Sequence, residues 1–168
     1  MRQHDYFLTL AGYHIWANAR LLEALESMRD NDYYADQGLF FHSVHHTLNH
    51  ILLVDRLWHG RLTGKPFTIT GLDQELVKER NTLVGEMKMA AETLKQLVAG
   101  LDDARLEASS VYVDTEGNRL EYPLCLQLAH VFNHASHHRG QVTSVITRLG
   151  LESPVLDLPY SRDEVMVH

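Results

Sequence analysis

Apolar residues recur at intervals of three and four, or their sums, along four long stretches of the chain. This is the spacing of one face of an α-helix. Gly and Pro are sparse in these stretches, whereas Leu, Ala, Glu and Arg, which favour helix, are common. We therefore predict helices over residues 5–28, 36–62, 72–101 and 124–149. Asp36 is the predicted N-cap of the second helix, with Phe40 on its buried side, and Gly150 ends the fourth.

Two of the connections are predicted to be more than tight turns. Residues 61–71 contain Gly64, Pro66 and Gly71, which predicts a loop of about ten residues between the second and third helices. Residues 110–114 and 119–122 alternate in polarity around a Gly-Asn turn, which predicts a short β-hairpin before the fourth helix. Residues 153–168 are predicted to form an extended tail on the surface.

Four long amphipathic helices with one long connection predict an all-α fold. We expect a single domain over residues 1–168 that forms a four-helix bundle. The loop between the second and third helices is long enough to cross the bundle, so those two helices can run in the same direction. The expected topology is therefore up-down-down-up.

Composition excludes several classes of protein. With 15 Lys and Arg against 22 Asp and Glu, the net charge is −7, and a nucleic acid is not expected as the main partner. The longest strictly apolar run is Ile51–Val54, far short of the roughly 20 residues that a membrane span needs. A single cysteine cannot form an internal disulfide, and no secretory-type signal is visible. We expect a cytoplasmic protein that does not enter membranes.

Histidine is concentrated in two windows of the sequence. Nine of the 12 histidines fall there, namely His42, His45, His46, His50 and His59 in the first and His130, His134, His137 and His138 in the second. His138 occupies a position of the apolar series in the fourth helix, and His134 lies one turn before it. The helical period places His130 and His137 toward the polar side of that helix. It also places His42, His45 and His46 outward from the second helix.

Three of these histidines are predicted to meet. His134 and His138 are four residues apart, so their Cβ atoms lie roughly 5 to 6 Å apart on one helix face. His50 lies at the margin of the apolar face of the second helix. His50 and the His134–His138 pair each lie about 20 Å from the start of their predicted helices. We therefore expect them to meet at the same height in the bundle. Three neutral imidazoles on one divalent ion leave positions for water or substrate, and a histidine-only set favours Zn²⁺, Ni²⁺, Cu²⁺ or Fe²⁺. The alternative is that they are ordinary core histidines with hydrogen-bonded rings.

Three separated motifs resemble those of the DinB family of metalloproteins. They are YHIWANARLL at residues 13–22, HILLVDRLW at residues 50–58 and NHASHHRGQ at residues 133–141, and their order and separation also match. The resemblance implies an up-down-down-up four-helix bundle, often a homodimer, with zinc or nickel on three histidines. Those ligands fall on His50, His134 and His138 of this chain.

The resemblance also implies a function. Some relatives use a low-molecular-weight thiol as cosubstrate, in S-transfer or isomerisation, so a metal-dependent enzyme acting on a small molecule is expected. No general base is identifiable in the sequence. The alternatives are a metal-dependent hydrolase and a non-catalytic metalloprotein in which the ion stabilises the fold or has a role in stress.

Other polar residues near the predicted site have two interpretations each. Asp55 either accepts a hydrogen bond from a ligand histidine or forms an ion pair with Arg20 or Arg139. Asn18 either reaches the metal cavity or makes a hydrogen bond between helices. His137 is either a proton shuttle or a solvated side chain. Packing roles are expected for Cys125, Trp16 and Trp58.

Overall fold

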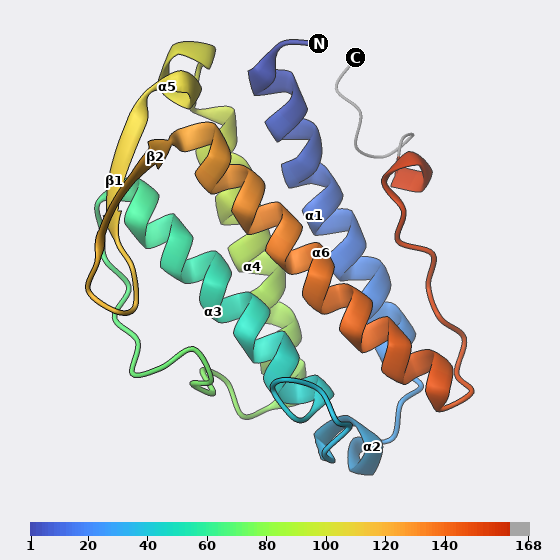
Figure 1. Ribbon diagram of the computed structural model, residues 1–168. Helices are drawn as coiled ribbons and strands as arrows, with labels where there is room; N and C mark the ends of the chain where they lie inside the picture. The colour runs from blue at the N-terminus through green and yellow to red at the C-terminus, as the bar shows by residue number, and fades with distance from the viewer. Residues whose placement is uncertain (162–168) are drawn as a thin grey trace.

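Four long helices lie side by side in the computed structural model, which describes residues 1–161 (Figure 1). They are α1 (Gln3–Leu25), α3 (Val44–Thr63), α4 (Arg80–Ala99) and α6 (Leu124–Arg148). α1 and α3 each pack against both α4 and α6. α3 and α4 run in one direction, and α1 and α6 run in the other (Figure 1). The fold is mainly helical, with one small two-stranded sheet.

The predicted β-hairpin is present. Strands β1 (Ser109–Val113) and β2 (Arg119–Pro123) are antiparallel, with Ser109 opposite Pro123. The turn between them passes through Gly117 at φ +89°, a conformation that glycine adopts without strain. The side chain of Gln127 on α6 donates to carbonyls of both arms of the hairpin, which holds the hairpin against the start of that helix.

The second long helix begins later than predicted. α3 starts at Val44, where the Ser43 hydroxyl accepts from the His46 amide, so the predicted cap at Asp36 is wrong. The Asp36 carboxylate instead accepts from the Gly38 amide in a turn. Phe40, predicted to be buried on this helix, lies in the preceding loop and is 80% exposed. Two short helices that the apolar period did not indicate, α2 (Asp30–Tyr34) and α5 (Asp103–Glu107), flank the long ones.

The third long helix also begins later than predicted, at Arg80 and not near residue 72. The residues before it form an extended connection that is held by Asn49 on α3. The Asn49 side-chain oxygen accepts from the amides of Leu76 and Val77, each at 2.9 Å. These bonds satisfy backbone groups that a helix would otherwise pair. The crossover is therefore longer than expected and lies against α3.

Apolar side chains of the long helices fill the interior between them. Fully buried members come from each of the four, including Leu21, Leu48, Leu94 and Val142. The chain after α6 is extended, as predicted, up to the short 3₁₀ helix η1 (Leu158–Ser161). The rest of the predicted tail, residues 162–168, lies outside the described part. Within residues 1–161, no helix combines the length and the apolar character that crossing a bilayer requires.

Candidate metal centre

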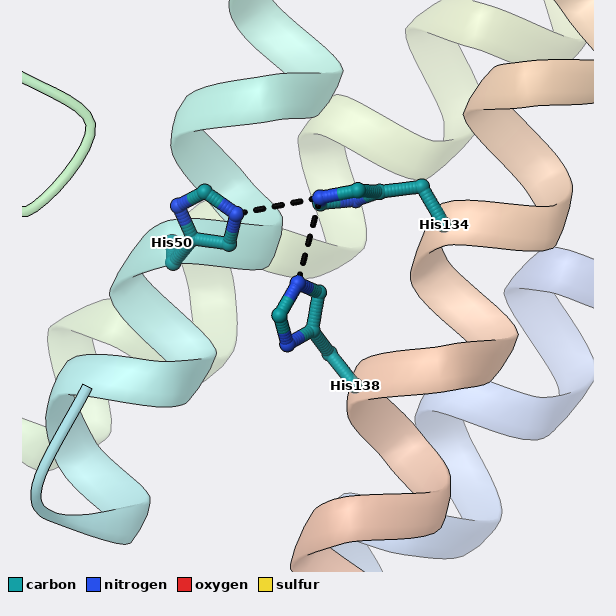
Figure 2. Close-up of side chains that lie close together, drawn as sticks. All are labelled: His50, His134 and His138. Carbon is teal, nitrogen blue, oxygen red and sulfur yellow. Dashed lines mark hydrogen bonds between the residues drawn. The ribbon is translucent and has the colours of Figure 1, made fainter. Parts of the chain in front are cut away.

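His50, His134 and His138, referred to below as the histidine trio, converge between α3 and α6 (Figure 2). The Nε2 atom of His134 lies 3.1 Å from Nε2 of His50 and 3.1 Å from Nε2 of His138. One ligand atom from each side chain lies within 4.8 Å of the others, so the three residues could hold a metal ion. The structure thus brings together the three histidines that helical spacing indicated.

The outer nitrogens of two of these rings are held by hydrogen bonds. Nδ1 of His50 lies 2.8 Å from the backbone oxygen of Leu72, which can only accept, so this nitrogen carries the proton. Nδ1 of His138 donates to the side-chain oxygen of Gln141, also at 2.8 Å. The Nε2 atom of each ring then carries a lone pair and no proton, and both lone pairs point toward His134. Metal-bound histidines are commonly oriented by such outer partners.

His134 cannot satisfy this arrangement alone. Its Nδ1 atom is buried and has no hydrogen-bond partner among the described residues. A proton on Nε2 would meet two competing lone pairs and could be donated fully to only one. A cation accepts lone pairs from all three rings at once. Nitrogens bound tetrahedrally at about 2.05 Å from zinc are roughly 3.3 Å apart, close to the 3.1 Å from His134 to each of the other two rings.

The trio is neutral near pH 7. Burial lowers the pKa of His50 to about 4, despite the opposing hydrogen bond to Leu72. The pKa of His134 falls to about 3, first because of burial and then because of His138 and His50 beside it. Burial also lowers the pKa of His138. Neutral imidazole is the form that coordinates a metal, so these rings need not lose protons before binding one.

A cleft of about 500 Å³ opens on the trio. Its walls include the aromatic side chains of Phe41, Trp58 and Tyr112. The Phe41 ring stacks on the His50 ring, with centroids 3.9 Å apart and planes 24° apart, which restricts the rotation of this imidazole. The cleft volume is in the range of small-molecule sites. A bound ion would therefore be open to a ligand on one side.

A second buried polar cluster lies in the core and joins three helices. It consists of His14 and Asn18 on α1, Asp55 on α3 and Arg139 on α6, and is referred to below as the His14 cluster. The His14 ring donates from Nε2 to the Asp55 carboxylate at 2.9 Å and accepts at Nδ1 from Arg139 at 3.1 Å. Arg139 also donates to the Asn18 side-chain oxygen at 3.0 Å. Burial lowers the pKa of the Arg139 guanidinium.

The His14 cluster contradicts both interpretations of Asp55 and selects one of the two for Asn18. Asp55 accepts from His14, and within residues 1–161 it makes no hydrogen bond to the trio and no ion pair with Arg20 or Arg139. The predicted helix-to-helix hydrogen bond of Asn18 is confirmed. Sequence reasoning missed His14 because it lies outside both histidine windows. Its position four residues before Asn18, on the same helix face, was the available signal.

The other histidines are mostly placed as predicted. His42, His46, His130 and His137 are exposed, but His45 is buried, so its predicted outward position is wrong. α2 and the crossover cover this face of α3. The His45 ring accepts from the Tyr33 hydroxyl at 3.3 Å and donates to Glu75 at 3.0 Å.

The predicted packing roles agree with the observed burial. Trp16 and Trp58 are both buried, and Trp58 also lines the cleft. Cys125 is half-buried beside an apolar cluster of α1 and α6.

Fold and site together define a mainly helical protein with three histidines that could hold a metal ion. The chain belongs to the DinB family, because the model of that family, described as "DinB family", matches residues 1–164. It is similar to a protein named "Protein DinB" from Bacillus subtilis (strain 168). The two are 25% identical over 169 aligned positions, which cover 91% of each chain.

Proposed function

We propose that the chain is an up-down-down-up four-helix bundle that binds zinc or nickel on His50, His134 and His138 and catalyses a thiol-dependent reaction on a small molecule. One observation carries this proposal. The Nε2 atoms of His50 and His138 are aimed at His134 by outer hydrogen bonds, and nothing among the described residues completes the bonding of the three rings. A divalent ion at this position would lower the pKa of a bound thiol and keep a nucleophile available at neutral pH.

The residues around the trio have supporting roles. Leu72 and Gln141 orient the His50 and His138 rings through their Nδ1 protons. Phe41 and Trp58 present apolar surface on the cleft wall, which displaces water from the reacting groups and accommodates an organic electrophile.

The cleft offers no carboxylate suited to act as a general base, and the only histidines beside the trio among its described lining residues are His130 and His137. Asp114 is the one carboxylate among the described residues that line the cleft. Its two oxygens accept from the amides of Glu116 and Asn118 and from the Asn118 side chain, which lowers the pKa of its carboxyl group. Asp114 is therefore a poor general base for activating water. A thiol that loses its proton on binding does not need such a base.

Activity assays on metal-loaded protein test the proposal. The purified protein would be supplied with a small thiol and 1-chloro-2,4-dinitrobenzene, and separately with a p-nitrophenyl ester without thiol. We expect metal-dependent conjugation that is lost in His138→Ala and retained in His137→Ala, its exposed neighbour. Ester hydrolysis without thiol would favour the hydrolase alternative. Strong stabilisation by metal with neither activity would favour a non-catalytic metalloprotein.

A further inference from the structure

Arg61 places a positive charge in the wall of the cleft that contains the trio. It is half-buried near the end of α3. Its guanidinium carbon lies 4.8 Å from the centre of the Trp58 ring and 4.9 Å from the centre of the Tyr112 ring. Both rings belong to the same cleft, so aromatic surface holds the cation in place.

Most of the N–H donors of this guanidinium have no hydrogen-bond partner among the described residues. One of its five N–H groups donates to the backbone oxygen of Val113 at 2.9 Å, and no other hydrogen bond from it is found within residues 1–161. Asp114 acts on Arg61 only through its charge, and its oxygens are used by the hairpin turn. Burial lowers the pKa of Arg61, which reflects partial removal of water from its charge. A guanidinium that has lost part of its hydration and has several N–H groups available is suited to binding a carboxylate.

Arg61 also lies where two hollows meet. A second hollow of about 580 Å³, bounded by the crossover and β1, shares Arg61, Leu57, Leu72 and Tyr112 with the cleft of the trio. With a divalent ion on the trio, Arg61 and the ion would outweigh the single charge of Asp114. The cleft would then be positive in a chain whose net charge is −7.

We propose that Arg61 is the anion-binding residue of this cleft and that the ligand is a small organic molecule with a metal-binding donor at one end and a carboxylate at the other. The donor binds at the trio, the carboxylate accepts from Arg61, and the aromatic walls contact the part between them. This inference rests on the proposed function, since it needs an ion on the trio.

A series of probe thiols tests the inference separately from the proposed function. Cobalt-loaded protein is titrated with ω-mercaptoalkanoates of increasing length and with the ω-mercapto alcohol of each length. The thiolate-to-cobalt charge-transfer band reports binding. We expect the carboxylate to bind roughly tenfold more tightly than its alcohol at one chain length, where it spans the distance from the ion to Arg61. At shorter lengths the two should bind equally.

Three variants assign the preference to Arg61. Arg61→Gln should abolish the carboxylate preference, and Arg61→Lys should retain part of it, since the charge remains without the fork. Arg20→Gln, on the exposed side of α1, removes the same charge elsewhere and should behave as wild type. Equal binding of acids and alcohols at every length by wild type, or a preference that persists in Arg61→Gln, would overturn the inference. Failure of every thiol to produce the band would instead count against the proposed function and, with it, against this inference.

Discussion

The histidine trio and the His14 cluster lie on overlapping sets of helices and both include buried imidazole rings, yet their hydrogen bonding is opposite in kind. His14 is 0% exposed and His50 is 4% exposed. In the His14 cluster, one ring nitrogen meets an acceptor, Asp55, and the other meets a donor, Arg139. In the trio, lone pairs face each other and one buried nitrogen has no described partner.

The difference separates a structural role from a binding role. Where the chain supplies complementary partners for a buried imidazole, the result is a cross-link between helices that needs nothing further. Where it supplies three groups of the same kind, residues 1–161 leave the bonding of the rings incomplete, and a cation could complete it. The burial of His14 and of His50 is nearly the same, but the chemical identity of the neighbours distinguishes the two clusters.

The largest expected effect is on stability, from the loss of the carboxylate in the His14 cluster. Asp55→Ala would remove the carboxylate that accepts from His14 and that acts through its charge on the buried Arg139 guanidinium. We expect the free energy of unfolding to fall by about 3–5 kcal/mol, measured by urea denaturation. Metal affinity of the folded variant should stay within a few-fold of wild type. A loss below about 1 kcal/mol would mean that the cluster is not a structural cross-link.

The next effect is on metal binding, from the removal of one member of the trio. His138→Ala should weaken the affinity for zinc more than 100-fold, measured by competition with a chromophoric chelator. Mutating a residue that only hydrogen-bonds to a metal ligand already lowers metal affinity roughly 10- to 100-fold, so loss of a ligand should cost more. His137→Ala is the matched control, since its ring is exposed beside the same site. Equal affinities of the two variants would refute the assignment of the ligands.

Acid should destabilise the metal-free protein below about pH 6.5, the ordinary pKa of histidine. The pKa values of His50 and His134 in the folded chain are about 4 and 3, so the unfolded chain binds more protons between these values and pH 6.5. Stability must then fall as the pH falls, by up to about 1.4 kcal/mol per pH unit for each ring. Urea denaturation at pH 5 and pH 7 measures it. The triple variant with glutamine at the trio positions should show a shallower dependence, and an unchanged slope would contradict the prediction.

The smallest effect is expected from an outer partner of the trio. Gln141→Leu removes the acceptor for the His138 Nδ1 proton, so the ring is oriented less well. Zinc affinity should fall roughly tenfold. The free energy of unfolding of the metal-free protein should change little, because Gln141 lies at the edge of the cleft. A loss as large as that in His138→Ala would indicate that Gln141 does more than orient the ring.

Local sequence patterns were sufficient to predict part of the fold and the members of the histidine trio. The apolar period indicated the four long helices, and alternation around a Gly-Asn turn indicated the hairpin. His134 and His138 share a helix face because of their spacing. The predicted depth of His50 was wrong, because it assumed a helix that starts at Asp36, whereas α3 starts at Val44, close to His50.

Helix starts were predicted less well. Ser43 caps α3 through a local contact with the His46 amide, a signal of the same type as the one assigned to Asp36. Asn49 holds the segment before α4 through contacts between residues far apart in the sequence, which no local pattern encodes.

The sequence by itself determined how apolar residues repeat along the long helices, and hence that four long helices form and that His134 and His138 share one helix face. Only the tertiary structure decided what each buried polar group faces. His14 is separated from Asp55 by 41 residues and from Arg139 by 125, and Arg61 meets Tyr112 only because the hairpin packs against α3. Helical period fixes the direction of a side chain within its own helix, whereas its hydrogen-bond partners depend on how separate helices pack.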